Sequence, residues 1–184
     1  MHARTARKIL SAVQEMLLKQ PSYSVTIVGH SLGGALALLD GVFLRLQLPE
    51  DVPVKVISYG MPRVGNQAFA DFVDSQLGGN VTHVNNREDR IPIVPDMSLG
   101  YHHPSGEIHI LDSGEWVACP GAYFLPSSLR AFEAGCVSLS DGCANYCLGQ
   151  DNPSESCIVG DVKNVLEGNS KDHDGPYAGI TIGC

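Results

Sequence analysis

Hydrophobic and polar positions along the first half of the chain switch repeatedly between a helical period and a strand period. Apolar residues recur every three to four positions in three segments, which predicts helices over 5–19, 32–48 and 66–77. Runs rich in β-branched residues lie between them and predict strands over 24–29, 54–59 and 81–85. Because helices and strands alternate, right-handed crossovers and a parallel sheet are expected.

The pattern changes after Asn86. A proline-rich loop follows over 87–95, and residues 107–111 and 116–118 are expected to form a hairpin around a turn at Ser113. A short helix is predicted over 162–166. A chain of 184 residues is long enough for one domain with a hydrophobic core. The predicted fold is therefore a single α/β domain over 1–184, with a mostly parallel sheet flanked by helices.

The run VTIVGHSLGGALA, over 25–37, places a serine between a strand and a helix. Gly29, Ser31 and Gly33 form the pattern G-x-S-x-G, which by itself occurs often by chance. Between a strand and a helix it is typical of the nucleophile elbow of α/β hydrolases. Gly29 and Gly33 lack a Cβ, so the strand and helix can approach closely around a strained serine. The backbone N–H of Leu32 is expected to point to a developing oxyanion.

A serine nucleophile needs a histidine base, and that base needs an acid to orient it. In α/β hydrolases the acid follows the serine along the chain and precedes the histidine. Asp89 is the favoured acid because it lies in the loop that follows the strand over 81–85. Glu88 is its nearest alternative, expected to be a solvated neighbour, and Asp96 is the next.

The favoured base is His173, which lies in a late loop, and His102 is the alternative. His102 and His103 both satisfy the Ser-Asp-His order. Asp172 and Asp174, beside His173, are expected to be solvated. Among the remaining histidines, His30 should point away from Ser31, whereas two others are expected to be ordinary packed or surface residues: His83 and His109.

Composition excludes several classes of function. The net charge is −8 with no basic cluster, which argues against a nucleic-acid partner. No apolar run approaches the ~18 residues that a membrane span needs. Six cysteines lie in the last 66 residues, which indicates disulfides and an oxidising compartment. Cys143 and Cys147 form only a weak candidate zinc pair, because no second pair or histidine follows at a matching offset.

Several stretches together resemble the fungal class 3 lipases, the Rhizomucor lipase-like family. They are YSVTIVGHSLGGALAL over 23–38, YGMPRVGN over 59–66, VNNREDRIPIVP over 84–95, LGYHH and EIHI within 99–110, and DHDGPY over 172–177. The resemblance implies an α/β-hydrolase fold with Ser31 as nucleophile, Asp89 as acid, His173 as base and the Leu32 N–H as an oxyanion donor. It also implies hydrolysis of lipid-like carboxylic esters, at a lipid–water interface, without a metal or cofactor.

The sequence departs from this family before the elbow. Only 30 residues precede Ser31. The early strands, the loop that supplies a second oxyanion donor and the lid of the family have no counterpart in them. We therefore expect a partial domain from a longer secreted protein, whose signal peptide was lost with the missing N-terminus.

A second departure is the segment 122–149, which matches nothing in the family. Its ends can be encoded with splice-site sequences, so we interpret it as a retained in-frame intron or a family-specific insertion. Its removal would leave Cys119 and Cys157 close enough in sequence for a short-loop disulfide, whereas the residues alone allow 15 pairings of six cysteines.

The expected function is that of an extracellular serine esterase, a triacylglycerol lipase that acts through an acyl-enzyme. A feruloyl-type or short-chain esterase on the same scaffold is the close alternative. A catalytically inactive lipase fragment is the alternative from another class, because an oxyanion donor is missing. A peptidase is disfavoured, since the sequence shows no peptide-binding cleft.

Overall fold

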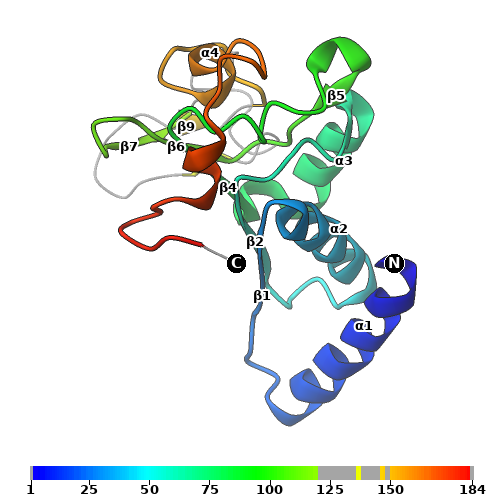
Figure 1. The fold of residues 1–184 in the computed structure, drawn as a ribbon. Helices are drawn as coiled ribbons and strands as arrows, with labels where there is room; N and C mark the ends of the chain where they lie inside the picture. Colours follow the sequence, from blue (N-terminus) through cyan, green and yellow to red (C-terminus); the bar gives the residue numbers. More distant parts are fainter. Residues whose placement is uncertain (1, 120–135, 138–145, 148–149, 183–184) are drawn as a thin grey trace.

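The computed structural model describes residues 2–119, 136–137, 146–147 and 150–182 (Figure 1). Most of the suspected insertion over 122–149 therefore lies outside the described residues. Two short strands within it are described, β8 (Cys136–Val137) and β9 (Tyr146–Cys147), and they pair antiparallel. The side chains of the candidate zinc pair, Cys143 and Cys147, also lie outside the described part.

A five-stranded sheet forms the centre of the molecule. Its spatial order is β1-β2-β4-β6-β7, and the first four strands are parallel. The hairpin partner β7 runs antiparallel to β6, as the sequence predicts. The bounds are β1 (Val25–His30), β2 (Val54–Tyr59), β4 (Val81–Asn86), β6 (Glu107–Ile110) and β7 (Trp116–Ala118).

Three helices confirm the predicted alternation with the strands: α1 (His2–Lys19), α2 (Leu32–Gln47) and α3 (Gln67–Leu77). Helix α2 packs on β1 and β2, and both α1 and α3 contact α2. Asn66 caps α3 as expected, since its side-chain oxygen accepts a hydrogen bond from the backbone N–H of Phe69 at 3.0 Å. In the described part of the chain, no helix is long and apolar enough to cross a membrane.

The prediction of a helix over 162–166 is wrong. A single helical turn, α4 (Ile158–Asp161), precedes this segment instead. Asn164 accepts hydrogen bonds from the N–H groups of Leu166 and Glu167 at 2.9 and 3.2 Å. A side-chain oxygen that binds nearby N–H groups competes with helical hydrogen bonds, so the segment forms a turn.

Several short elements carry too few residues to give a periodic signal. Strands β3 (Gly65–Asn66) and β5 (Tyr101–His102) pair antiparallel outside the main sheet. Three short 3-10 helices complete the described elements: η1 (Gly78–Asn80), η2 (Met97–Leu99) and η3 (Ser170–Asp174).

A disulfide joins Cys119, after β7, to Cys157, before α4, with a Cα–Cα distance of 5.8 Å. It spans 38 residues and confirms the pair suggested by the short-loop argument. Both sulfurs are buried, and the bond ties the segment after the suspected insertion to the end of the sheet. The side chains of the other four cysteines lie outside the described residues.

The core between α2 and the sheet depends on a close approach at Gly41. A Cβ at this position would lie 2.3 Å from Cγ2 of Val56, a fully buried residue of β2. Real Cβ contacts are longer than this, so helix and strand are closer than any side chain at residue 41 allows.

His83 and His103 form a stacked pair of rings in the interior, with centroids 4.8 Å apart. Their Nε2 atoms face the carbonyl oxygens of Pro104 and Pro92 at 3.0 and 2.7 Å, so each ring donates from Nε2. Burial lowers the pKa of each histidine to about 3, and the positive charge of Arg63 contributes for His103. Both rings are therefore neutral in the folded chain at neutral pH.

We predict opposite effects of alanine at two helical glycines. Gly41→Ala should lower the free energy of unfolding by ~1–3 kcal/mol, because it overpacks the contact with Val56. Gly33→Ala is the matched control, since its Cβ would meet nothing within 4 Å and alanine favours a helix by up to ~1 kcal/mol. Urea unfolding measures both, and equal midpoints for the two variants would contradict the packing argument.

The histidine pair predicts acid sensitivity. In the unfolded chain His103 binds a proton below pH ~6.5, whereas the folded chain binds it only near pH 3, so stability falls as the pH drops through this range. His103→Gln should therefore flatten the loss of unfolding free energy between pH 6 and 5 by ~1 kcal/mol per pH unit. Urea titrations of both proteins at several pH values test this, and parallel pH profiles would refute it.

Candidate active site

Ser31 lies on the turn between β1 and α2, as the motif predicts. Its backbone has φ 55° and ψ −129°, a positive-φ conformation that is strained for a residue with a side chain. Its N–H donates to the carbonyl of Tyr59, at the end of the neighbouring strand, at 2.9 Å. Ser31 occupies the N-cap position of α2, but within the described chain its hydroxyl makes no capping hydrogen bond. A strained turn thus presents a hydroxyl that is not used for capping.

Close approach around this turn involves one of the two expected glycines and one that was not expected. A Cβ on Gly29 would lie 2.1 Å from the carbonyl oxygen of Gly33, so Gly29 is required as predicted. A Cβ on Gly33 would meet nothing within 4 Å, so the expectation for that side of the motif is wrong. The second tight contact is at Gly34, whose Cβ would lie 3.1 Å from that of Ser58.

Asp89 and His173, 84 residues apart, are joined by a hydrogen bond. Nδ1 of His173 lies 2.8 Å from Oδ2 of Asp89, and the other carboxylate oxygen accepts from the N–H of Ile91 at 2.9 Å. Asp89 is fully buried, whereas the His173 side chain is 15% exposed. Because the carboxylate accepts, Nδ1 carries the proton and Nε2 is left as a base.

The charge on Asp89 depends on its partners. Burial raises the pKa of this carboxyl, while the hydrogen bonds from His173 and from the Ile91 N–H act in the opposite direction. The imidazole therefore favours the ionised carboxylate, and the carboxylate in turn orients the imidazole.

Gly60 makes the space for this pair. It follows β2 with φ +54°, and its N–H donates to the carbonyl of Val84 at 2.8 Å. A Cβ at this position would lie 2.8 Å from Oδ2 of Asp89 and 2.9 Å from Nδ1 of His173. The sequence analysis missed this role, and the only available signal was the first glycine of the stretch YGMPRVGN.

The loop that carries His173 is held through its backbone carbonyls. Asn86 donates its side-chain amide to the carbonyl of Asp172 at 2.8 Å, and Tyr177 donates its hydroxyl to that of His173 at 3.1 Å. Asp172 was expected to be solvated, and this expectation is wrong. It is buried because its backbone carbonyl is bound by the side chain of Asn86. Asp174 is exposed, as expected. The position of His173 is thus set by residues from other elements.

His30 was expected to point away from Ser31, and the structure shows what it contacts. Its Nε2 lies 2.8 Å from the backbone oxygen of His173, and the two rings pack with centroids 4.5 Å apart. The residue before the serine therefore touches the histidine that pairs with Asp89.

The alternative acids lie away from this arrangement. Glu88 is exposed, as expected for a solvated neighbour. Asp96 is also exposed and caps η2 by accepting from the N–H of Ser98 at 2.8 Å. Hydrogen bonding to Ser98, first to its side chain and then to its backbone N–H, lowers the pKa of Asp96, so its carboxylate is committed to the cap. Neither carboxylate reaches His173.

The alternative bases also have other partners. Nδ1 of His102 pairs with Asp151 at 3.2 Å rather than with Asp89. His109 is fully buried between the carbonyls of Arg87 and Ser156, and His83 and His103 form the stacked pair in the core. His83 and His109 are therefore packed residues, as expected.

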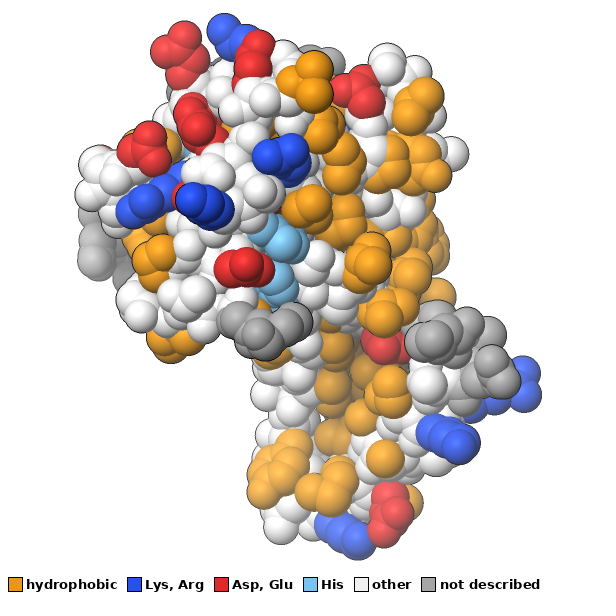
Figure 2. All heavy atoms as spheres, in the orientation of Figure 1, with side chains coloured by type: hydrophobic (Ala, Val, Ile, Leu, Met, Phe, Trp, Pro, Cys, Tyr) orange, Lys and Arg blue, Asp and Glu red, His pale blue; other side chains and the backbone are white. Residues whose placement is uncertain are grey.

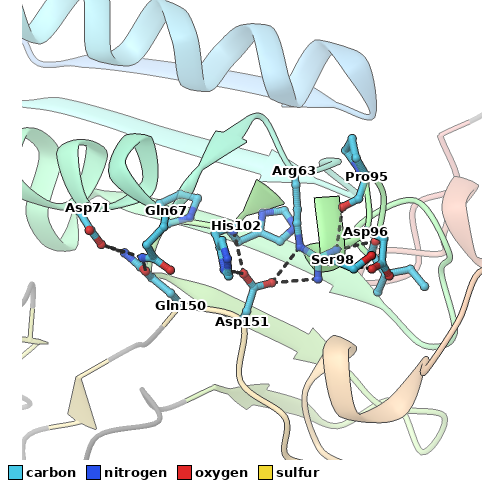
Figure 3. A network of polar contacts seen from close by, with 12 residues as sticks. Arg63, Gln67, Asp71, Pro95, Asp96, Ser98, His102, Gln150 and Asp151 are labelled. Carbon is cyan, nitrogen blue, oxygen red and sulfur yellow. Dashed lines mark hydrogen bonds and ion pairs between the residues drawn. The ribbon is translucent and has the colours of Figure 1, made fainter. Parts of the chain in front are cut away.

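Figure 3 shows a polar network that fixes the loop after Asp89. Arg63 binds Asp151 through Nε and Nη2, both at 3.0 Å, and the side chains of this pair are almost fully buried. The Arg63 guanidinium also donates to the carbonyls of Ile93 and Pro95. The backbone N–H of Arg63 donates to the carbonyl of Val94 at 2.9 Å. One arginine thus binds the carbonyls of three consecutive residues of this loop, an arrangement that sequence analysis missed.

The surface on one side of the site is apolar. Figure 2 shows histidine atoms reaching the surface of one face, between hydrophobic side chains on one side and an acidic side chain on the other. Leu32, directly after Ser31, is 72% exposed, and Leu36 and Ile180 are also exposed. The backbone N–H of Leu32 is in the first turn of α2, where backbone N–H groups have no acceptor within the helix. Among the described residues, no cluster of three or more His, Cys, Asp or Glu side chains is placed to hold a metal.

Comparison with known proteins places this arrangement in a family. The family described as "Lipase (class 3)" matches residues 1–99, more than half of the chain. The secreted mono- and diacylglycerol lipase MDL2 of Malassezia globosa is 40% identical over 115 residues. That match covers 61% of this chain and 38% of the relative, so the chain spans about two fifths of the length of this relative.

Solved structures agree on the fold. A triacylglycerol lipase whose catalytic centre is described as a serine protease triad is 33% identical, with a TM-score of 0.57, over 63% of this chain and 44% of that one. The Rhizomucor miehei triacylglyceride lipase aligns over 98% of this chain and 57% of its own, with a TM-score of 0.70 and 24% identity, a likeness of fold alone. From the family match and these likenesses, we conclude that the chain belongs to the class 3 lipase family and has the α/β-hydrolase fold.

Proposed function

We propose that this chain carries the catalytic centre of a serine carboxylic ester hydrolase, a triacylglycerol lipase. The observation that carries the proposal is the hydrogen bond between Asp89 and His173, formed beside the strained turn of Ser31. The family match contains Ser31 and Asp89, while His173 lies beyond it. A similar structure is named a triacylglycerol lipase with a serine protease triad, which supports the same assignment.

In the proposed reaction, Ser31 Oγ attacks the ester carbonyl and Nε2 of His173 accepts its proton. Asp89 keeps the proton on Nδ1 and stabilises the imidazolium that forms. The Leu32 N–H is one donor to the oxyanion, favoured by its place in the first turn of α2. His173 then returns the proton to the leaving alcohol, and water hydrolyses the acyl-enzyme with the same histidine as base. These steps need no metal or cofactor.

The proposed substrates are lipid esters met at a lipid–water interface. Exposed leucines beside the nucleophile give an apolar approach for acyl chains. The relatives are named lipases of mono- and diacylglycerols, and several are named secreted. A buried disulfide also favours an oxidising, extracellular location.

We further propose that residues on both sides of 122–149 belong to one domain. Asp89 precedes that segment and His173 follows it, yet they form one pair. The Arg63–Asp151 ion pair and the disulfide also bridge it. These ties support 122–149 as an insertion, or a retained intron, within a single lipase domain, and transcript sequencing distinguishes the two.

The triad is tested by a serine-reactive phosphonate. The full chain should be labelled at Ser31 and hydrolyse emulsified long-chain triacylglycerols in preference to soluble aryl esters. Ser31→Ala should lose both the labelling and the ester hydrolysis. Asp89→Asn should lower kcat by ~10⁴-fold, because it favours the wrong tautomer of His173. Ser75→Ala, an exposed serine of α3, is the control. Absence of labelling in the folded full chain would overturn the proposal, and a preference for aryl esters would overturn its lipase part.

The space at Gly60 gives a second prediction. Gly60→Ala should lower kcat/KM by at least ~10²-fold, because its Cβ displaces the Asp89–His173 pair. Gly78 has nearly the same φ, +52° against +54°, but its Cβ would meet nothing within 4 Å. Gly78→Ala therefore also places a Cβ on a residue with positive φ, at a cost of ~1–3 kcal/mol, but without the clash. Ester hydrolysis per folded molecule should fall only in Gly60→Ala, and equal losses would contradict the proposed contact.

A further inference from the structure

We infer that His30 is a positioning residue, which fixes the backbone of the catalytic histidine relative to the strand that carries the nucleophile. This inference rests on the proposed function, because it concerns the geometry of that same site. It assigns a role to the first of the two variable residues of G-x-S-x-G, which the motif itself does not specify.

The contact has a defined chemical sense. His30 Nε2 lies 2.8 Å from the backbone oxygen of His173, 143 residues later in the chain. A carbonyl only accepts, so Nε2 of His30 carries a proton and donates it. The rings also pack at 4.5 Å with an interplanar angle of 37°. His30 thus holds His173 by a hydrogen bond to its backbone and by contact with its ring.

The position of His30 makes this hydrogen bond a short tie between nucleophile and base. His30 is the last residue of β1, paired in register with Tyr59 of β2, and Ser31 follows it directly. Any displacement of the His173 loop relative to β1 must therefore stretch the His30 hydrogen bond. In this way the sheet supplies the reference for the distance between Ser31 and His173.

A second donor shares the same carbonyl. The Tyr177 hydroxyl donates to the His173 oxygen at 3.1 Å, and its ring packs edge-on against Tyr59 and His30 at 5.1 and 6.2 Å. Burial raises the pKa of this phenol, so it remains a donor at neutral pH. The carbonyl of His173 is thus held by two donors from different segments.

These backbone ties complement the hydrogen bond to Asp89. The carboxylate fixes Nδ1 of the ring, whereas His30 and Tyr177 fix the main chain from which the ring extends. Two separated anchor points define where Nε2 points, and one alone leaves the ring free to swing. Because misplacement by ~1 Å can cost ~10²-fold in rate, the second anchor bears directly on catalysis.

The test compares His30→Leu, which lacks a donor, with His30→Gln, which keeps an amide donor. In the full chain, His30→Leu should lower kcat/KM by ~10–10²-fold through kcat, with KM nearly unchanged, and His30→Gln should recover part of it. Tyr177→Phe alone should have a smaller effect because His30 remains. The double variant, His30→Leu with Tyr177→Phe, should lose more than the product of the single losses, since the two donors back each other up.

A spectroscopic readout separates this inference from the proposed function. The Nδ1–H of His173, bound to Asp89, should give a downfield proton resonance that shifts or broadens in His30→Leu and is restored in His30→Gln. This signal does not require turnover, so it tests the tie even if the full chain fails to hydrolyse esters. Tyr23→Phe, at a half-exposed tyrosine outside the site, is the control for Tyr177→Phe.

Three results would overturn the inference. The first is a His30→Leu variant with unchanged resonance and kcat/KM within twofold of the parent. The second is a His30→Gln variant that loses as much as His30→Leu, which would assign the effect to ring packing. The third is a single and double variant series that is strictly multiplicative. Thermal unfolding of each variant shows whether a loss of signal reflects a lost fold. If His30→Leu does not fold, His30→Gln is compared directly with the parent chain, and a loss of the His173 resonance in folded His30→Gln would then overturn the inference.

Discussion

Parallel pairing of β1, β2 and β4 is the constraint on which the rest of this structure depends. Parallel strands all end at the same edge of the sheet, where ligand sites of open α/β sheets form. Ser31 follows β1, Gly60 follows β2 and Asp89 lies just beyond β4, so each arrives at one edge. The three elements contribute the proposed nucleophile on a strained turn, a position without a side chain, and the proposed, buried acid.

The proposed base, His173, reaches this edge by a different route. His173 lies in a 3-10 turn that is far along the chain from every strand of the main sheet, and its position is imposed by side chains that bind backbone carbonyls. Asn86 at the end of β4 and His30 at the end of β1 both contribute donors. The sheet therefore positions the histidine indirectly, through the residues that terminate two of its strands.

The buried pair of Arg63 and Asp151 links the acid loop to the segment that follows 122–149. A buried ion pair gains little net stability, because two charges must leave water. Its value in this chain is geometric, since the guanidinium organises several carbonyls of the loop and Asp151 neutralises it. Both oxygens of Asp151 are used, as the second accepts from the N–H of His103 at 3.0 Å. The pair thus connects two distant segments and the region of the stacked histidines.

Much of the architecture is local and could be predicted from the sequence. The alternation of helices and strands through residue 86, the cap at Asn66 and the hairpin of β6 and β7 all follow from periodicity and turn chemistry. The pairing of Asp89 with His173 was also expected, because chain order and loop position restrict the choice. Segments of two residues, such as β3 and β5, and the turn around Asn164 give no periodic signal, so they could not be anticipated.

By itself, the sequence determined which residues carry chemical groups suited to a serine hydrolase and which local elements present them. Only the tertiary structure decided that Gly60 leaves space for the acid–base pair, that Asp172 is buried, and that His30 binds the carbonyl of His173. The physical reason is that these facts are distances between segments up to 143 residues apart. Periodicity reports only the neighbours of a residue along the chain, whereas close approach and burial depend on packing across the sheet.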